Sequence, residues 1–86
     1  MNDIVGTLKE RDSQYGTYID QAAISQDIKA AMQKGRRWGE LAPDQRETLD
    51  LIANKIARIL NGNPDFHDSW FDIQGYAKLV ADRLAK

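Results

Sequence analysis

Several kinds of chemistry are excluded by what the sequence lacks. The 86 residues include no cysteine, so disulfides, thiolate catalysis and cysteine ligands for zinc are all excluded. The single histidine, His67, would leave a zinc site to carboxylates alone, which zinc rarely accepts. No apolar run approaches the ~20 residues that a membrane-spanning helix needs. The first residues, "MNDIVGTLKERDS", lack the apolar centre of a signal peptide, so we expect a cytoplasmic protein.

The sequence also has no excess of charge of either sign. The net charge is −1, which gives no overall field to attract nucleic acid or an anionic membrane. The one basic cluster, "KGRRWG" at 34–39, stands where cations favour the end of a helix. We expect no membrane association. A phosphate or nucleic-acid contact through Lys34, Arg36 and Arg37, with Trp38 as a stacking group, is the weakest hypothesis because the net charge is negative. The 42% of apolar residues is typical of a globular chain, and the length predicts one domain, 1–86, with a small core.

Glycine and proline divide the chain into helical stretches, and no segment alternates as a strand would. Pro43 is a favoured first residue of a helix, the sequence "NGNP" at 61–64 is a strong turn signal, and Asp65 is the predicted N-cap of the last helix. The sequence predicts an all-α fold, a small bundle of about four helices whose last two form an antiparallel hairpin. The predicted helices cover about 2–12, 18–34, 43–60 and 66 to the end.

The helical period assigns two faces to each helix of the predicted hairpin. The predicted core faces are Leu49, Ile52, Ile56, Ile59 and Leu60 on the third helix, with Phe66, Trp70, Ile73, Ala77, Val80 and Leu84 on the fourth. The second stripes are Glu47, Leu51, Lys55 and Arg58 on the third helix, with Asp68, Asp72, Gly75 and Leu79 on the fourth.

The second stripes allow two interpretations. Two carboxylates one helical turn apart, Asp68 and Asp72, can hold Mg²⁺ through oxygen, while Lys55 and Arg58 neutralise phosphates. The same four residues can instead form a structural ion-pair network or remain solvated charges. Whether they bind a ligand or form an ion-pair network, we expect the aspartates to face the two cations across a shallow groove between the third and fourth helices, which Gly75 keeps open, or across a dimer interface.

Three segments resemble a family of small phage and prophage proteins of unassigned function. More distantly, they resemble nucleotide-modification-associated domains and MazG-like all-α NTP pyrophosphohydrolases. The resemblance lies in an early Tyr-Gly motif, a Lys-x-x-Arg helix and an Asp-x-x-x-Asp-x-x-x-Tyr helix. The segments are "RDSQYG" at 11–16, "NKIARIL" at 54–60 and "DSWFDIQGYA" at 68–77.

The resemblance implies nucleotide binding with Mg²⁺ in a host cytoplasm. Its nucleotide and phosphate ligands would be Lys55, Arg58 and Tyr76, and its metal ligands Asp68, Asp72 and Glu47. MazG-like enzymes hold Mg²⁺ with an ExxE pair and an ExxD pair. This chain has no ExxE, and only "ETLD" at 47–50 fits ExxD, so the resemblance implies binding more than hydrolysis.

The alternative function is a non-enzymatic protein that interacts with other proteins or assembles with itself. Self-association is expected under either hypothesis, because so short a chain buries little apolar surface alone. A homodimer with two-fold symmetry is the commonest arrangement.

Overall fold

The computed structural model describes residues 13–86, and the predicted helix at 2–12 lies outside this range. The elements after Gly16 are the helices α2 (Tyr18–Met32), α3 (Pro43–Asn61) and α4 (His67–Leu84), with a 3-10 turn η1 (Trp38–Glu40) before α3. No strand occurs within the described part. The all-α prediction is confirmed as three helices and a 3-10 turn. No helix of this part is long and apolar enough to cross a membrane.

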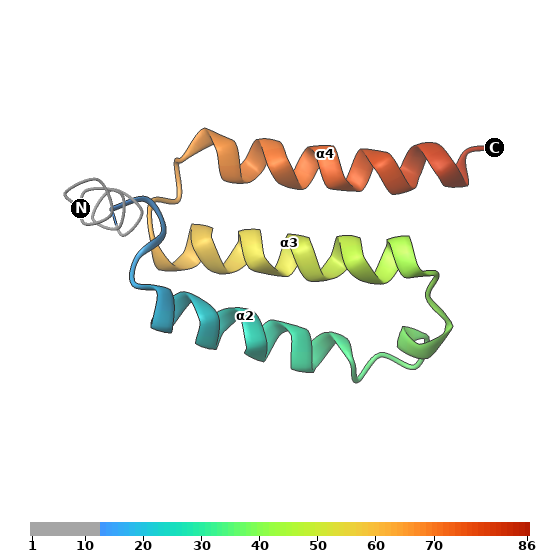
Figure 1. Cartoon of the computed structure of the whole chain (residues 1–86), viewed down its shortest axis with the longest axis horizontal. Coiled ribbons are helices and arrows are strands. Elements are labelled where there is room, and N and C mark those ends of the chain that lie inside the picture. Colours follow the sequence, from blue (N-terminus) through green and yellow to red (C-terminus); the bar gives the residue numbers. More distant parts are fainter. Residues whose placement is uncertain (1–12) are drawn as a thin grey trace, which may run out of the picture.

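The three helices lie in a row, with α3 in the middle and α2 and α4 on its two sides (Figure 1). The α4 helix runs antiparallel to α3 after a short turn, so the predicted hairpin is confirmed. The α3 helix begins at Pro43, as predicted, and Gly62 is its C-cap. Because α2 and α4 each pack mainly against α3, only the middle helix is covered on two sides.

Residues 13–17 are tied to the turn between α3 and α4. The Asn61 side-chain amide donates to the carbonyls of Tyr15 (2.8 Å) and Thr17 (3.0 Å). Gly16 has a positive φ of 76°, and a Cβ there would lie 2.2 Å from the Asn61 carbonyl oxygen. A Cβ on Gly62 would lie 2.2 Å from the backbone oxygen of Gln14. Both glycines are therefore required by the close approach of two backbone segments.

The predicted cap of α4 is wrong. The N-cap position is occupied by Phe66, whose side chain makes no capping hydrogen bond. Asp65 lies one residue earlier, where its backbone N–H donates to the side chain of Asn63 at 2.9 Å. The reason is local, because the Asn63 side chain organises the turn and the helix begins one residue later than the Asp65 cap required.

The core of the described part is small and partly polar. Within this chain Leu60, Trp70 and Leu84 are 67%, 55% and 56% exposed, so their predicted burial is wrong. The described helices form a single row, and none of the three covers the broad sides of that row, which explains the difference. The buried residues are Ala53, Ala57 and Ile59, together with Gln21, Ser25 and Ser69.

Candidate functional site

The contact predicted between the second stripes of α3 and α4 is present at one pair. The Lys55 ammonium lies 2.9 Å from an Asp72 carboxylate oxygen. The Lys55 side chain is 13% exposed and that of Asp72 is 41% exposed, so the cation is the more enclosed partner. This ion pair satisfies Lys55 without any ligand.

A second ion pair joins the same two helices near their other ends. The Arg83 guanidinium donates to both carboxylate oxygens of Asp44, through Nη2 at 2.8 Å and through Nε. Asp44 and Lys55 are eleven residues apart on α3, and Asp72 and Arg83 are eleven apart on α4. The two pairs therefore follow one antiparallel register. The hydrogen bond from Arg83 holds the pKa of Asp44 below its ordinary value.

The other predicted ligands do not join Lys55 and Asp72. The Arg58 guanidinium lies over the ring of Tyr15, 4.6 Å from its centroid, and Arg58 lines a pocket between α2 and α3. Asp68 has a 71% exposed side chain beside His67, with 3.3 Å between their nearest polar atoms. The structure thus separates the four predicted residues into one ion pair and two independent positions.

Glu47, the third predicted metal ligand, is exposed. No group of three or more His, Asp or Glu side chains suited to a metal ion occurs among residues 13–86. The Mg²⁺ hypothesis therefore stays a prediction.

The outer side of α4 carries a hollow of about 290 Å³. It includes Tyr76, which was predicted to bind a nucleotide, together with Asp72. A Cβ on Gly75 would meet no atom within 4 Å, so no neighbour in this chain requires the glycine. The lining residues are Phe71, Asp72, Gly75, Tyr76 and Leu79.

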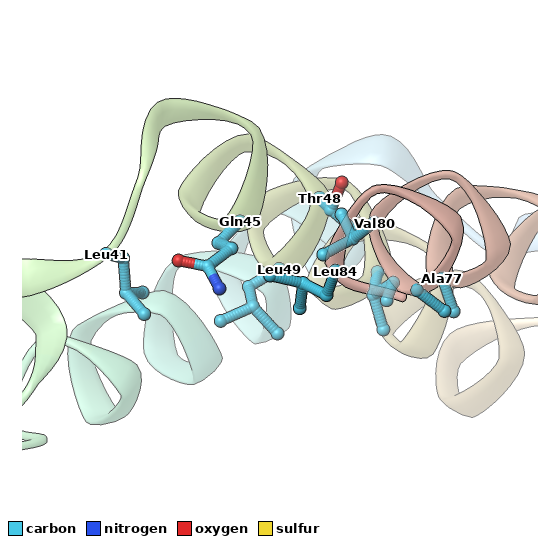
Figure 2. Close-up of a pocket in the computed structure, with 9 residues that line it drawn as sticks. Leu41, Gln45, Thr48, Leu49, Ala77, Val80 and Leu84 are labelled. Carbon is cyan, nitrogen blue, oxygen red and sulfur yellow. The ribbon is translucent and has the colours of Figure 1, made fainter. Parts of the chain in front are cut away.

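An apolar groove of about 380 Å³ lies between the first half of α3 and the last half of α4 (Figure 2). Leu49 and Leu84 line it, with Leu41 at one end. None of its lining residues is charged. They are Leu41, Gln45, Thr48, Leu49, Ile52, Ala77, Val80, Ala81 and Leu84.

A polar pocket of about 250 Å³ lies on the opposite flank of α3, against α2. The Ser25 hydroxyl donates to the Asn54 side-chain oxygen at 2.6 Å and joins the two helices there. Sequence reasoning missed this pocket. The signal was a polar stripe on α2 at four-residue intervals, Gln21, Ser25 and Lys29.

Comparison with family models, with curated proteins and with solved structures gives no match. The function of the chain must therefore be argued from its own geometry.

Proposed function

We propose that this protein is a self-associating interaction module, in which a second copy covers the apolar side of the α3–α4 hairpin. We call that side the hairpin face. The observation that carries the proposal is the charge-free groove on this side, where Leu49 and Leu84 are exposed, together with the exposed Leu60 and Trp70 near the turn of the hairpin. The hairpin face consists of Leu41, Leu49, Ile52, Ile56, Leu60, Trp70, Ala77 and Leu84.

The spacing of these residues supports a partner that is itself helical. Leu49 and Ile56 are seven residues apart on α3, and Trp70, Ala77 and Leu84 recur every seven residues on α4. Apolar residues at this interval form the seams of helical bundles, where side chains of one helix enter spaces on the next. Two hairpins joined through such seams make a four-helix bundle.

The distribution of charge and shape favours a second copy over a different protein. Because the groove contains no charged side chain, two copies meet there without repulsion between like charges. The groove occupies the open end of the hairpin, whereas Leu60 and Trp70 are exposed near its turn. A two-fold axis across the face places the turn end of each copy over the groove of the other.

A single copy also has reason to associate. Only three apolar residues are buried in the described part of the chain. Fully covering an exposed leucine contributes about 1.5–3 kcal/mol, so burying the leucines of the hairpin face against a second copy would add to the small core of one copy.

Nucleotide binding, which the resemblance to phage and MazG-like proteins implies, is the second candidate. The observation that favours it is the hollow on α4, where Asp72 and Tyr76 lie together. Titration of nucleoside triphosphates with and without Mg²⁺ tests it, and binding that depends on Mg²⁺ and is lost in Asp72→Asn is the expected result. Absence of binding at millimolar nucleotide contradicts it.

Sedimentation equilibrium of matched variants tests self-association. Leu84→Lys alters the hairpin face, and Leu79→Lys makes the same change on the other side of α4, where Leu79 is 70% exposed. We expect the wild type to be a dimer at micromolar concentration. We expect Leu84→Lys to weaken it about a hundredfold or more, because a two-fold dimer carries the change twice.

Leu79→Lys is expected to leave the dimer intact. A wild type that stays monomeric at high micromolar concentration contradicts the proposal. Dissociation by Leu79→Lys alone would place the interface on the outer side of α4 instead.

A further inference from the structure

The α2 and α3 helices meet along a seam that is polar at its centre. Gln21 and Ser25 are 5% and 4% exposed, which is unusual for side chains of their kind. The hydrogen bond from Ser25 to Asn54 crosses the seam. The pocket of about 250 Å³ lies on this seam and is lined by Tyr18, Gln21, Ala22, Ser25, Gln26, Lys29, Asn54 and Arg58. We call it the seam pocket.

The seam pocket carries positive charge without a matching negative charge. Lys29 and Arg58 both line it, and no aspartate or glutamate is among its lining residues. Several other cations of the described part are paired, as Lys55 is with Asp72 and Arg83 with Asp44, whereas no ion pair of Lys29 or Arg58 occurs among the described residues. Two cations in one partly enclosed pocket repel one another, and an anion between them would relieve that repulsion.

Of the two cations in the seam pocket, Arg58 gives the stronger evidence for an anionic ligand. Its guanidinium lies over the Tyr15 ring, and its Nε is a buried donor with no acceptor in the described part of the structure. A buried donor without an acceptor is costly, and more so when it belongs to a charged group. An acceptor supplied by a ligand would remove this cost.

The neutral groups of the seam pocket offer both acceptors and donors. The Gln21 side-chain oxygen is a buried acceptor with no donor in the described part, so it requires an O–H, which a monoprotonated phosphate carries. The Asn54 side-chain oxygen accepts from Ser25, so the N–H₂ of the same amide remains available as a donor. The pocket is smaller than the ~300–1,000 Å³ that holds drug-sized ligands, so it suits one anionic group rather than a whole nucleotide.

We propose that the seam pocket binds a small oxyanion, a phosphate ion or the phosphate group of an ester, between Lys29 and Arg58. The guanidinium offers its fork of N–H donors to the oxyanion, and the ammonium adds a second charge. This site lies on the α2 flank of α3 and is separate from the hairpin face. The proposal of oxyanion binding can therefore be wrong while the proposal of self-association is right, and the reverse.

Titration of the full chain with inorganic phosphate, and separately with adenosine monophosphate, tests the site at constant ionic strength in chloride. Binding is followed by NMR through the backbone amides of Gln21, Ser25 and Asn54. The variant is Lys29→Gln, and its control is Lys34→Gln, which removes an exposed lysine outside the pocket. Arg58→Gln is the second variant, with its melting temperature recorded to show that it folds.

We expect saturable shifts at these three amides. Lys29→Gln and Arg58→Gln should each weaken binding about tenfold or more, and Lys34→Gln by less than about twofold. Equal affinity for both ligands identifies the phosphate group alone as the ligand, and tighter binding of the nucleotide identifies the ester. The proposal is overturned if neither ligand gives saturable shifts at the pocket, or if Lys34→Gln weakens binding as much as Lys29→Gln does.

Discussion

The two flanks of α3 are built from different chemistry. Towards α2, small and polar side chains meet, and a hydrogen bond between Ser25 and Asn54 joins the helices. Towards α4, two ion pairs follow one edge of the contact, and an apolar groove remains open beside it. The first contact leaves a small polar pocket, whereas the second leaves leucines exposed beside an apolar groove. For this reason the second copy that we propose covers the α4 side of α3 rather than the α2 side.

Small residues explain how the α2 flank closes. Ala57 is 0% exposed and shares a face with Asn54 and Asn61, which bond to α2 and to the residues just before it. Alanine lets two helices approach until short polar side chains can reach each other. On the α4 flank, longer apolar side chains such as Leu49 line the open groove instead.

The largest loss of stability is expected from a substitution in the turn between α3 and α4, which also contacts the segment before α2. Gly62→Ala places a Cβ 2.2 Å from the Gln14 carbonyl oxygen and 2.4 Å from the Tyr15 Cα, and neither backbone atom can move without shifting the segment before α2. We expect a loss of about 3 kcal/mol or more in the free energy of unfolding, measured by urea denaturation. The control is Gly39→Ala, whose Cβ meets no atom within 4 Å. A loss of similar size in both variants would contradict the close approach.

The next largest loss of stability is expected when the polar contact between α2 and α3 is broken. Ser25→Ala removes the hydroxyl that donates to Asn54 and leaves that part-buried oxygen without its partner. We expect a loss of about 1–3 kcal/mol in the free energy of unfolding, by thermal or urea denaturation. Gln74→Ala, at an exposed polar residue of α4, is the control and should change stability much less. A neutral Ser25→Ala would show that the seam does not depend on this hydrogen bond.

Asp72→Asn tests the α4 flank and should cost less than Ser25→Ala. The substitution leaves Lys55 charged in an enclosed position, but Asp72 itself is 41% exposed, so water screens the pair. We expect a loss of about 1 kcal/mol in the free energy of unfolding. Asp82→Asn, which breaks the exposed pair with Lys78, should cost only a few tenths of that amount. Equal losses would show that the enclosure of Lys55 has no energetic effect.

The smallest effect is expected for the ion pair of Asp44 and Arg83, whose contribution to stability depends on pH. Arg83 lowers the pKa of Asp44 below its ordinary value of 3.8, so the unfolded chain takes up a proton at this carboxyl before the folded one does. The stabilisation is complete above 3.8 and is lost as the pH falls through the lowered pKa. The difference in melting temperature between wild type and Asp44→Asn should therefore disappear in strong acid. A difference that persists there would contradict the assignment.

The sequence predicted the hairpin but not the flank that faces α2. Pro43 and the "NGNP" turn are local signals, and they located the start of α3 and the reversal of the chain correctly. The contact between Lys55 and Asp72 followed from the stripes of two helices known to be neighbours. The pair of Ser25 and Asn54 joins residues 29 positions apart, and no local pattern encodes such a contact.

The predicted core failed for a different reason. Periodicity shows which residues share a face, but it does not show whether anything covers that face. Leu60, Trp70 and Leu84 were assigned to core faces by their spacing, yet they are exposed, and the three described helices lie in a single row. If a second copy covers the hairpin face, the sequence identified the core of the dimer rather than that of one chain.

The fluorescence of Trp70 tests this central claim most directly. Trp70 is 55% exposed in a single copy, where its indole N–H donates to the Pro64 carbonyl at 2.8 Å. In a Trp38→Phe background, Trp70 is the only tryptophan that reports. We predict that its emission shifts to shorter wavelength as the concentration rises from nanomolar to high micromolar, and that Leu84→Lys abolishes the shift. Emission that does not change while sedimentation shows a dimer would contradict the account, because the second copy would then lie away from the hairpin face.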